Sequence, residues 1–271
     1  MRYLPTIVGL LFAFAACGRA PQSQTRAAPG PSDSDPVWHY EGEEGPEHWG
    51  DLAPAFAACR DGRMQSPIDI ASATPAGKAP ALTLRFPAAT LRIAHHEHIA
   101  DGINNGHTIQ VTYDQGDTLT VGDRAYELVQ YHFHTPSEHT FSGRRYPREM
   151  HMVHRATGGS LAVVAVMIDE GRHDAAFDPI WANLPGTRGI EKHYEHIKVD
   201  VDALLPSVHA SYRYDGSLTT PPCTEGVSWF VLTTPIELDR SQIAAFSALI
   251  PGNSRPVQPL NGRTILSDVV H

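Results

Sequence analysis

Short runs rich in β-branched and aromatic residues recur along the chain, and they restrict its fold more than any other feature. Turn residues separate the runs, as in Asp114-Gln115-Gly116 and Val121-Gly122-Asp123, and this spacing is typical of β-strands. The runs are residues 82–86, 108–113, 118–121, 126–134, 149–154, 161–167, 211–214 and 227–232. They predict a mostly β fold with a large, mainly antiparallel central sheet.

Helical signals are few. The best begins at Asp239, which is followed three residues later by Gln242 in a capping-box pattern. Apolar residues then recur at helical spacing until Pro251-Gly252 ends the pattern. The helices are therefore expected to be short and to lie at the periphery of the sheet.

Residues 1–17 have the features of an export signal. Arg2 provides a positive start, residues 4–16 are almost wholly apolar, and small residues precede Cys17. The apolar run is too short to cross a bilayer comfortably as a helix. Residues 14–17 are similar to a bacterial lipobox with an unusual Phe14, which favours lipidation of Cys17 over ordinary cleavage nearby. The protein is thus expected in the periplasm or cell envelope, with a membrane tether through Cys17 as one option.

The rest of the chain divides into a linker and one domain. Residues 18–36 are rich in Pro, Ser, Gly and Ala, which predicts a flexible linker. Residues 37–271 contain no further linker or detectable repeat and are long enough to bury a substantial core. The formal net charge of −9 argues against nucleic acid as a partner, because an acidic domain repels phosphate backbones.

Cys17 lies in the predicted export signal, so the rest of the chain contains two cysteines, Cys59 and Cys223, which can pair. In an exported protein the compartment is oxidising, so a disulfide is the expected state. Two free buried thiols are one alternative. Ligation of zinc by the thiolates is another, disfavoured because a set of histidines exists elsewhere.

Two strand-like segments place histidines at alternate positions. Successive side chains of a strand point to opposite faces, so His132 and His134 share a face with Gln130. Glu149 and His151 repeat the arrangement. If the two strands are neighbours, three imidazoles converge.

Three neutral imidazoles are a common ligand set for catalytic zinc, since they leave the ion its full charge and an open position for water. A histidine pair on a strand also occurs often on protein surfaces, and this chain has 16 histidines. Gln130 and Glu149 favour the metal site, because ligating histidines need hydrogen-bond acceptors that fix their tautomers.

From about Trp38 to its C-terminus, the chain resembles the α-carbonic anhydrases. The similarity rests on segments that occur in the order of the family: residues 45–49, 65–70, 104–107, 130–134, 137–140, 149–154 and 216–223. It implies a twisted sheet of about ten strands, at the upper end of the usual range. It also implies one Zn²⁺ per chain, held by His132, His134 and His151 at the base of a conical cleft, and carbonic anhydrase is itself the best-known example of this chemistry.

The resemblance implies further roles. Gln130 and Glu149 would orient the zinc ligands. Thr219 would accept a hydrogen bond from zinc-bound hydroxide while donating its own proton to Glu138, which aims the hydroxide at carbon. His107 would be the proton shuttle, since histidine exchanges protons near neutral pH; a solvated loop histidine without a role is the alternative.

The substrate pocket is implied to be an apolar wall that receives carbon dioxide, although the same residues would also suit core strands. The expected pocket residues are Val153, Val163, Leu218, Thr220, Val227 and Trp229. Its polar side is expected to contain Tyr40, Asn105 and Gln110 next to His107. Sulfonamides and anions are the expected inhibitors, and a homodimer is left open because bacterial members of the family are often dimers.

The expected function is reversible hydration of carbon dioxide to bicarbonate and a proton, with weak ester hydrolysis as a side activity. The protein would thus be a zinc-dependent lyase. One alternative is a binding module that keeps the fold without the chemistry, but such modules typically lack one or more zinc histidines. Another is a structural zinc site, which would need a fourth protein ligand.

Overall fold

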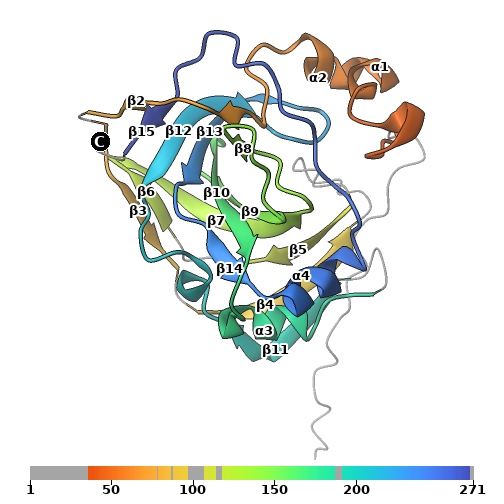
Figure 1. Cartoon of the computed structure of the whole chain (residues 1–271), viewed down its shortest axis with the longest axis vertical. Coiled ribbons are helices and arrows are strands. Elements are labelled where there is room, and N and C mark those ends of the chain that lie inside the picture. The colour runs from red at the N-terminus through yellow and green to blue at the C-terminus, as the bar shows by residue number, and fades with distance from the viewer. Residues whose placement is uncertain are drawn as a thin grey trace, which may run out of the picture.

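The computed structural model describes residues 36–77, 79–86, 88–96, 107–113, 118–186 and 191–268 (Figure 1). The predicted export signal, Cys17, almost all of the predicted linker and Asn105 lie outside these residues. None of the described helices is long and apolar enough to cross a membrane.

One large mixed sheet dominates the described residues, which confirms the predicted mostly β fold. It contains 13 strands, and its main path runs in the order β11-β4-β5-β7-β9-β10-β13-β12-β15-β2, while β3, β6 and β14 pair beside this path. Their bounds are β2 Thr74–Pro75, β3 Leu82–Arg85, β4 Ala89–His96, β5 Thr108–Thr112, β6 Thr118–Val121, β7 Arg124–His134, β9 Arg148–Arg155, β10 Leu161–Glu170, β11 Glu191–Val199, β12 Ser211–Ser217, β13 Glu225–Leu232, β14 Ile236–Leu238 and β15 Leu266–Ser267. A separate two-stranded sheet joins β1 Asp69–Ile70 to β8 Thr140–Phe141.

Most neighbouring strands are antiparallel, as predicted. β10 is the main exception: it runs antiparallel to β9 but parallel to β13 and β14. The sheet has more strands than expected because β4, β11 and several two- or three-residue strands were not predicted. Most side chains of β11 are exposed and many are polar, so this strand lacks the apolar alternation by which strands are recognised. Charged side chains on a strand at the end of a sheet also discourage pairing with other chains.

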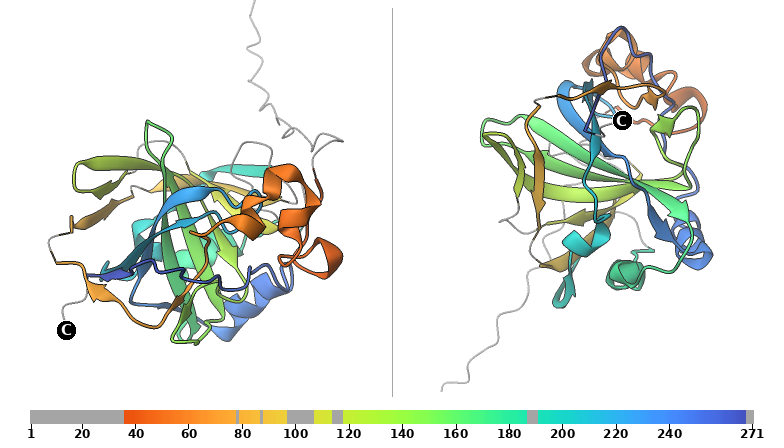
Figure 2. Two further views of the ribbon diagram at one scale, coloured as in Figure 1. Left: turned by 90° about the horizontal axis from the view of Figure 1, so that it is seen from above. Right: turned by 60° about the vertical axis from the view of Figure 1, so that its left-hand side comes forward.

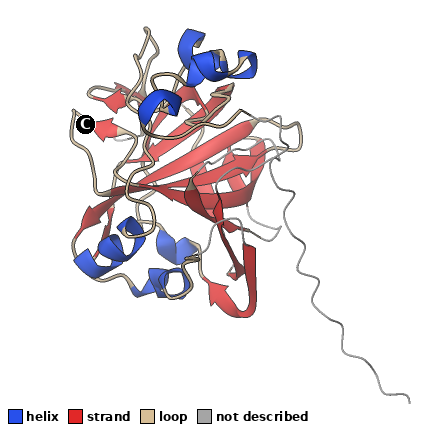
Figure 3. Ribbon diagram, turned by 90° about the vertical axis from the view of Figure 1, so that its right-hand side faces the viewer, coloured by secondary structure: helices blue, strands red, loops and turns tan. Residues whose placement is uncertain are grey.

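The described helices are short and lie at the periphery of the sheet, as predicted (Figure 3). Their bounds are η1 Gly42–Glu44, α1 Trp49–Leu52, η2 Pro54–Phe56, α2 Ala58–Asp61, η3 Ala175–Phe177, α3 Asp178–Trp181, η4 Asp202–Leu204 and α4 Arg240–Ser247. Helix α4 has the predicted capping box, because Asp239 accepts from the backbone of Gln242 and the Gln242 side chain accepts from the backbone of Asp239. The helix ends at Ser247, before the predicted Pro251-Gly252. Figure 2 shows α1 and α2 at one end of the sheet, with α4 at the other.

The two faces of the central strands bury different cores. One face carries the larger core, which includes Tyr131 and Phe133 of β7 and Met150 of β9. The opposite face carries a smaller apolar cluster, which includes Val163 of β10 and Trp229 of β13. Because side chains alternate along a strand, the histidines at alternate positions of β7 lie on the face of this smaller cluster.

A third cluster packs the N-terminal helices against the loop after β12. It contains Trp38, Trp49, Phe56 and the pair Cys59 and Cys223. The two cysteines form a disulfide with a Cα–Cα distance of 5.0 Å. The predicted bridge is thus confirmed, and the alternative of free thiols is not realised.

Candidate metal centre

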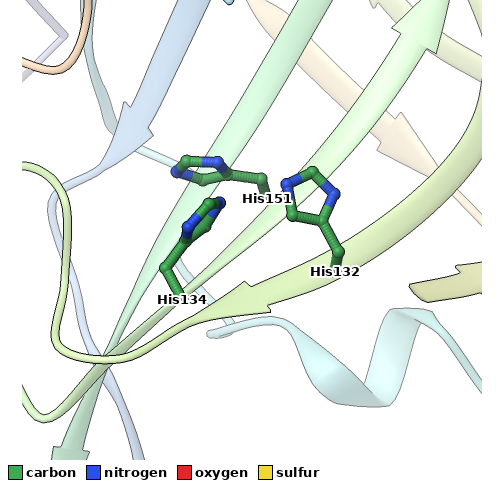
Figure 4. Close-up of side chains that lie close together, drawn as sticks. All are labelled: His132, His134 and His151. Carbon is green, nitrogen blue, oxygen red and sulfur yellow. The ribbon is translucent and has the colours of Figure 1, made fainter. Parts of the chain in front are cut away.

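Strands β7 and β9 are antiparallel neighbours, and their register places His132 directly opposite His151. His134 lies two residues along β7, so its side chain points to the same face. All three imidazoles are almost completely buried, and one ring nitrogen of each lies within 4.8 Å of the others. Figure 4 shows the three rings turned toward one another.

Hydrogen bonds hold the two histidines of β7 in one tautomer. The Nδ1 atom of His132 lies 2.8 Å from Oε1 of Gln130, and Nδ1 of His134 lies 2.8 Å from the backbone oxygen of Asn253. Both partners are acceptors, so each Nδ1 carries the proton. The Nε2 atom of each ring therefore keeps a lone pair, and Nε2 of His134 is buried without a hydrogen-bond partner in the part of the chain that the structure describes.

The third histidine has the opposite tautomer. Its acceptor is Oε1 of Glu149, 2.8 Å from Nε2 of His151, so Nδ1 keeps the lone pair. Glu149 also accepts from Nδ1 of His139 at 2.6 Å and from the backbone amides of Glu138 and His139. Although burial works to raise it, the adjacent His139 and His151 hold the pKa of Glu149 well below its usual range. The carboxylate is thus a fixed anchor for the His151 ring.

Burial keeps the histidines of β7 neutral. It lowers the pKa of His132 well below its ordinary value, and the neighbouring His134 and His151 lower it further. Burial also lowers the pKa of His134, and Glu138 offsets only part of this effect. Neutral imidazoles with inward lone pairs are the form that binds a cation.

Glu138 lies next to this set and is completely buried. Its Oε1 accepts from the backbone amide of Arg255 at 2.8 Å, whereas Oε2 has no hydrogen-bond partner among the described residues. Thr219 is also buried, in the turn that follows β12, but the structure records no hydrogen bond from it to Glu138. The Oε2 atom is therefore an acceptor still available within the site.

Apolar side chains continue the same face of the sheet beyond the histidines. Val163 on β10 pairs with Val153 on β9 and with Trp229 on β13, and the ring centroids of Trp229 and His151 are 4.9 Å apart. Leu218 and Val227 belong to the same buried cluster. Thr220 is buried in the turn beside Thr219. The predicted wall thus adjoins His151.

Polar residues of the predicted cleft come from β5 and from the N-terminal segment. Gln110 on β5 lies directly opposite His132. The Tyr40 hydroxyl is buried without a hydrogen-bond partner among the described residues. Burial, and then the nearby Glu138, raise the pKa of Tyr40 well above its usual range. His107 immediately precedes β5, has a positive φ of 49° and is half-buried.

Four further residues, which were not predicted, contact the predicted site residues. Asn253 and Arg255 reach them from the loop after α4, and His139 binds Glu149 and, through Nε2, the Tyr214 hydroxyl at 2.7 Å. The fourth, His39, contacts His107. Asn253 is 119 residues from His134 in the sequence, so no local pattern links them.

The residues present fit a zinc ion. One potential ligand nitrogen from each of three imidazoles lies within 4.8 Å of the others, and among the described residues no fourth His, Cys, Asp or Glu joins this set. The second cluster, His139, Glu149 and His151, is occupied by its own hydrogen bonds. Three protein ligands with an open position are typical of catalytic zinc, whereas a structural site has four. The fold and the site therefore define a β-sheet protein with a candidate three-histidine metal site.

Comparison with known proteins identifies the family. The model of the eukaryotic-type carbonic anhydrases matches residues 44–269. A carbonic anhydrase of Nostoc sp. is 42% identical over 233 residues, which is 86% of each chain. The chain belongs to the eukaryotic-type, or α, carbonic anhydrase family.

Solved structures agree in fold. The α-carbonic anhydrase of Thermovibrio ammonificans, in complex with the inhibitor sulfanilamide, has a TM-score of 0.79 and 37% identity, covering 86% of this chain and 100% of that one. Dioscorin complexed with ascorbate has a TM-score of 0.76 and 28% identity, covering 85% and 97%. Since one fold occurs in proteins with such different ligands, the function must be argued from the site.

Proposed function

We propose that this protein is a zinc-dependent carbonic anhydrase, a lyase that reversibly hydrates carbon dioxide to bicarbonate and a proton. The observation that carries the proposal is the convergence of three buried imidazole lone pairs, from His132, His134 and His151, in a member of this family. When bound, the zinc ion would act as a Lewis acid that makes water nucleophilic near neutral pH. The same chemistry would support weak ester hydrolysis.

The residues around the ligands would hold the centre rigid. Gln130, Glu149 and the backbone oxygen of Asn253 each fix one imidazole through a 2.8 Å hydrogen bond. Ligands fixed in advance lose little freedom when the ion binds, which favours affinity and a defined geometry. His139 would support Glu149 in turn through its 2.6 Å contact.

Thr219 would orient the attacking oxygen. A threonine hydroxyl has one proton, so once it donates to Oε2 of Glu138 it can only accept from a second partner. The Oε2 atom, which has no hydrogen-bond partner within the described ranges, supports this role. Thr219→Val should lower kcat/KM about 100-fold, in the range for loss of an orienting hydrogen bond. Thr219→Ser should retain most activity, and a Thr219→Val variant with normal kcat/KM would contradict the role.

The apolar wall would receive carbon dioxide and exclude competing water. Val153, Val163 and Trp229 offer a surface without charge next to His151. The expected pocket also includes Leu218 and Val227, while Thr220 lies at its border. Aromatic sulfonamides and anions are proposed inhibitors, by analogy with the sulfanilamide complex of the Thermovibrio ammonificans relative.

His107 would carry the released proton away. The reaction yields one proton per turnover, and a half-buried imidazole just before β5 would take it up and release it near neutral pH. His107→Ala should lower kcat by roughly 10- to 100-fold in weak buffer. It should leave kcat/KM nearly unchanged, because attack on carbon does not use this proton, and added imidazole should restore turnover.

One experiment tests the function as a whole. Purified protein should contain one zinc per chain, hydrate carbon dioxide and be inhibited by an aromatic sulfonamide. His151→Ala should lose both zinc and activity, whereas His196→Ala, an exposed histidine on β11, should keep both. Near-normal zinc content and activity in His151→Ala would contradict the ligand assignment.

A non-catalytic binding module is the second candidate, since dioscorin complexed with ascorbate shares the fold. Zinc-loaded protein without hydration activity would favour it.

The disulfide agrees with export to the periplasm or cell envelope, which we propose together with the signal at residues 1–17 and the linker at residues 18–36. A tether through Cys17 and a homodimer are further proposals, which intact mass and sedimentation would test.

A further inference from the structure

His107 is the first member of a row of three ionisable side chains, which continues through His39 to Glu44. Its Nε2 atom lies 2.9 Å from Nδ1 of His39, and their ring centroids are 4.8 Å apart. On the other side of the His39 ring, Nε2 lies 3.4 Å from a carboxylate oxygen of Glu44. The His39 and Glu44 side chains are 45% and 48% exposed, so the row ends in solvent.

The hydrogen bonds give the row one direction. Nε2 of His107 also lies 3.2 Å from the backbone oxygen of Trp38, and a carbonyl oxygen can only accept. Nε2 of His107 therefore carries a proton, and Nδ1 of His39 faces it as the acceptor. In the neutral His39 ring the proton then resides on Nε2, which faces the Glu44 carboxylate. Along the row, Nε2 of His107 is thus a donor to Nδ1 of His39, and Nε2 of His39 is a donor toward Glu44.

Buried tryptophans hold this row in place. The Trp49 indole donates to the backbone oxygens of His39, at 2.8 Å, and Glu44, at 3.1 Å. The amide of His39 also donates to the backbone oxygen of Glu44 at 2.8 Å. Trp38 and Trp49 are completely buried, and the Trp38 ring lies 5.6 Å from the His107 ring. The turn that carries His39 and Glu44 is therefore anchored to the third core cluster.

We propose that His39 extends the proton route of His107 to solvent, with Glu44 at its outer end. The inference rests on the proposed function, in which His107 takes up the proton released by hydration. His107 would gain a proton at Nδ1 and pass the proton on Nε2 to Nδ1 of His39. His39 would then release its Nε2 proton to Glu44 or to water. Each ring gains one proton and loses one, so both end neutral but in the opposite tautomer. Exchange with water would return each proton from Nδ1 to Nε2 before the next turnover.

Steady-state hydration kinetics in weak buffer test the relay. His39→Gln keeps an acceptor for His107 but cannot carry a proton, so we expect kcat to fall about 3- to 10-fold while kcat/KM stays unchanged. Glu44→Gln should reduce kcat less, because water can replace the carboxylate. His196→Ala, which removes an exposed histidine on β11, is the matched control and should behave as wild type.

A double variant separates a shared route from independent ones. His39 would act through His107, so His39→Gln combined with His107→Ala should have the same kcat as His107→Ala alone. Imidazole added to the buffer should restore kcat in His39→Gln. Unchanged kcat in His39→Gln, with a reduced kcat in His107→Ala, would overturn the relay and leave the shuttle intact. Unchanged kcat in both variants would overturn the shuttle itself.

A measurement independent of turnover tests the geometry. ¹⁵N chemical shifts distinguish the two neutral tautomers of histidine, and they should report a protonated Nε2 on both His107 and His39. A protonated Nδ1 on His39 would break the proposed direction of transfer. A folded His39→Gln protein with wild-type zinc content and melting temperature would show that the kinetic loss is not a loss of structure.

Discussion

Reduction of the disulfide should destabilise the protein strongly, because the disulfide closes a long loop. Cys59 and Cys223 are 164 residues apart in the sequence. In the chain-entropy model a crosslink over this separation stabilises the folded state by about 5 kcal/mol at 25 °C. For a domain of this size each kcal/mol corresponds to about 2–4 °C in melting temperature, so reduction should lower Tm by about 10–20 °C.

The bridge also connects to the site through hydrogen bonds. The Cys59 carbonyl accepts from the guanidinium of Arg255 at 3.0 Å, and the Arg255 amide donates to Glu138. Cys223 follows four residues after Thr219 in the same turn. Loss of the bridge should therefore loosen the turn that holds Thr219, with a lower kcat/KM at temperatures where the protein is still folded.

Thermal unfolding of zinc-loaded protein, with and without a thiol reductant, measures the effect. The variant Cys59→Ala/Cys223→Ala should melt at the temperature of the reduced wild type and should not respond to reductant. A decrease in Tm of less than about 2 °C on complete reduction would refute the loop-entropy reasoning. Two free thiols titrated in native, oxidised protein would refute the pairing itself.

Three further predictions concern residues other than the proposed zinc ligands. His154 is completely buried beside Phe86, and burial lowers its pKa to about 3. The neutral, buried imidazole therefore contributes fully to stability above about pH 6.5, the pKa of an unfolded histidine. This contribution is lost as the pH falls toward 3. At pH 5 the loss should be about 2 kcal/mol, and His154→Leu should show a flatter dependence of unfolding free energy on pH between 7 and 5. Arg148→Met should cost about 2–4 kcal/mol in denaturant unfolding, because the buried guanidinium donates to Thr135, to Ser247 and to a backbone oxygen of α4. Arg155→Met, on the exposed end of the same strand, is its control. Intact-mass measurement of exported protein should find an acylated Cys17, and an unmodified N-terminus beyond residue 17 would exclude the anchor.

Local patterns in the sequence were sufficient for the chemistry of the ligand set. His132 and His134 share a face because alternation is a property of the strand itself, and Glu149 accompanies His151 for the same reason. The capping box of α4 is equally local, since its two partners are three residues apart. By contrast β11 was missed, because a mostly exposed strand has no apolar alternation to reveal it.

Only the tertiary structure decided which distant segments of the chain meet. The register of β7 against β9 sets His132 opposite His151, and the loop after α4 brings Asn253 to His134. His39 reaches His107 across 68 residues of sequence. Such contacts between loops and strands have no periodicity, because they depend on how separate elements pack and not on the geometry of any one of them. The sequence thus determined which residues could bind a metal, and packing determined how they are oriented and which side chains form the proposed proton route.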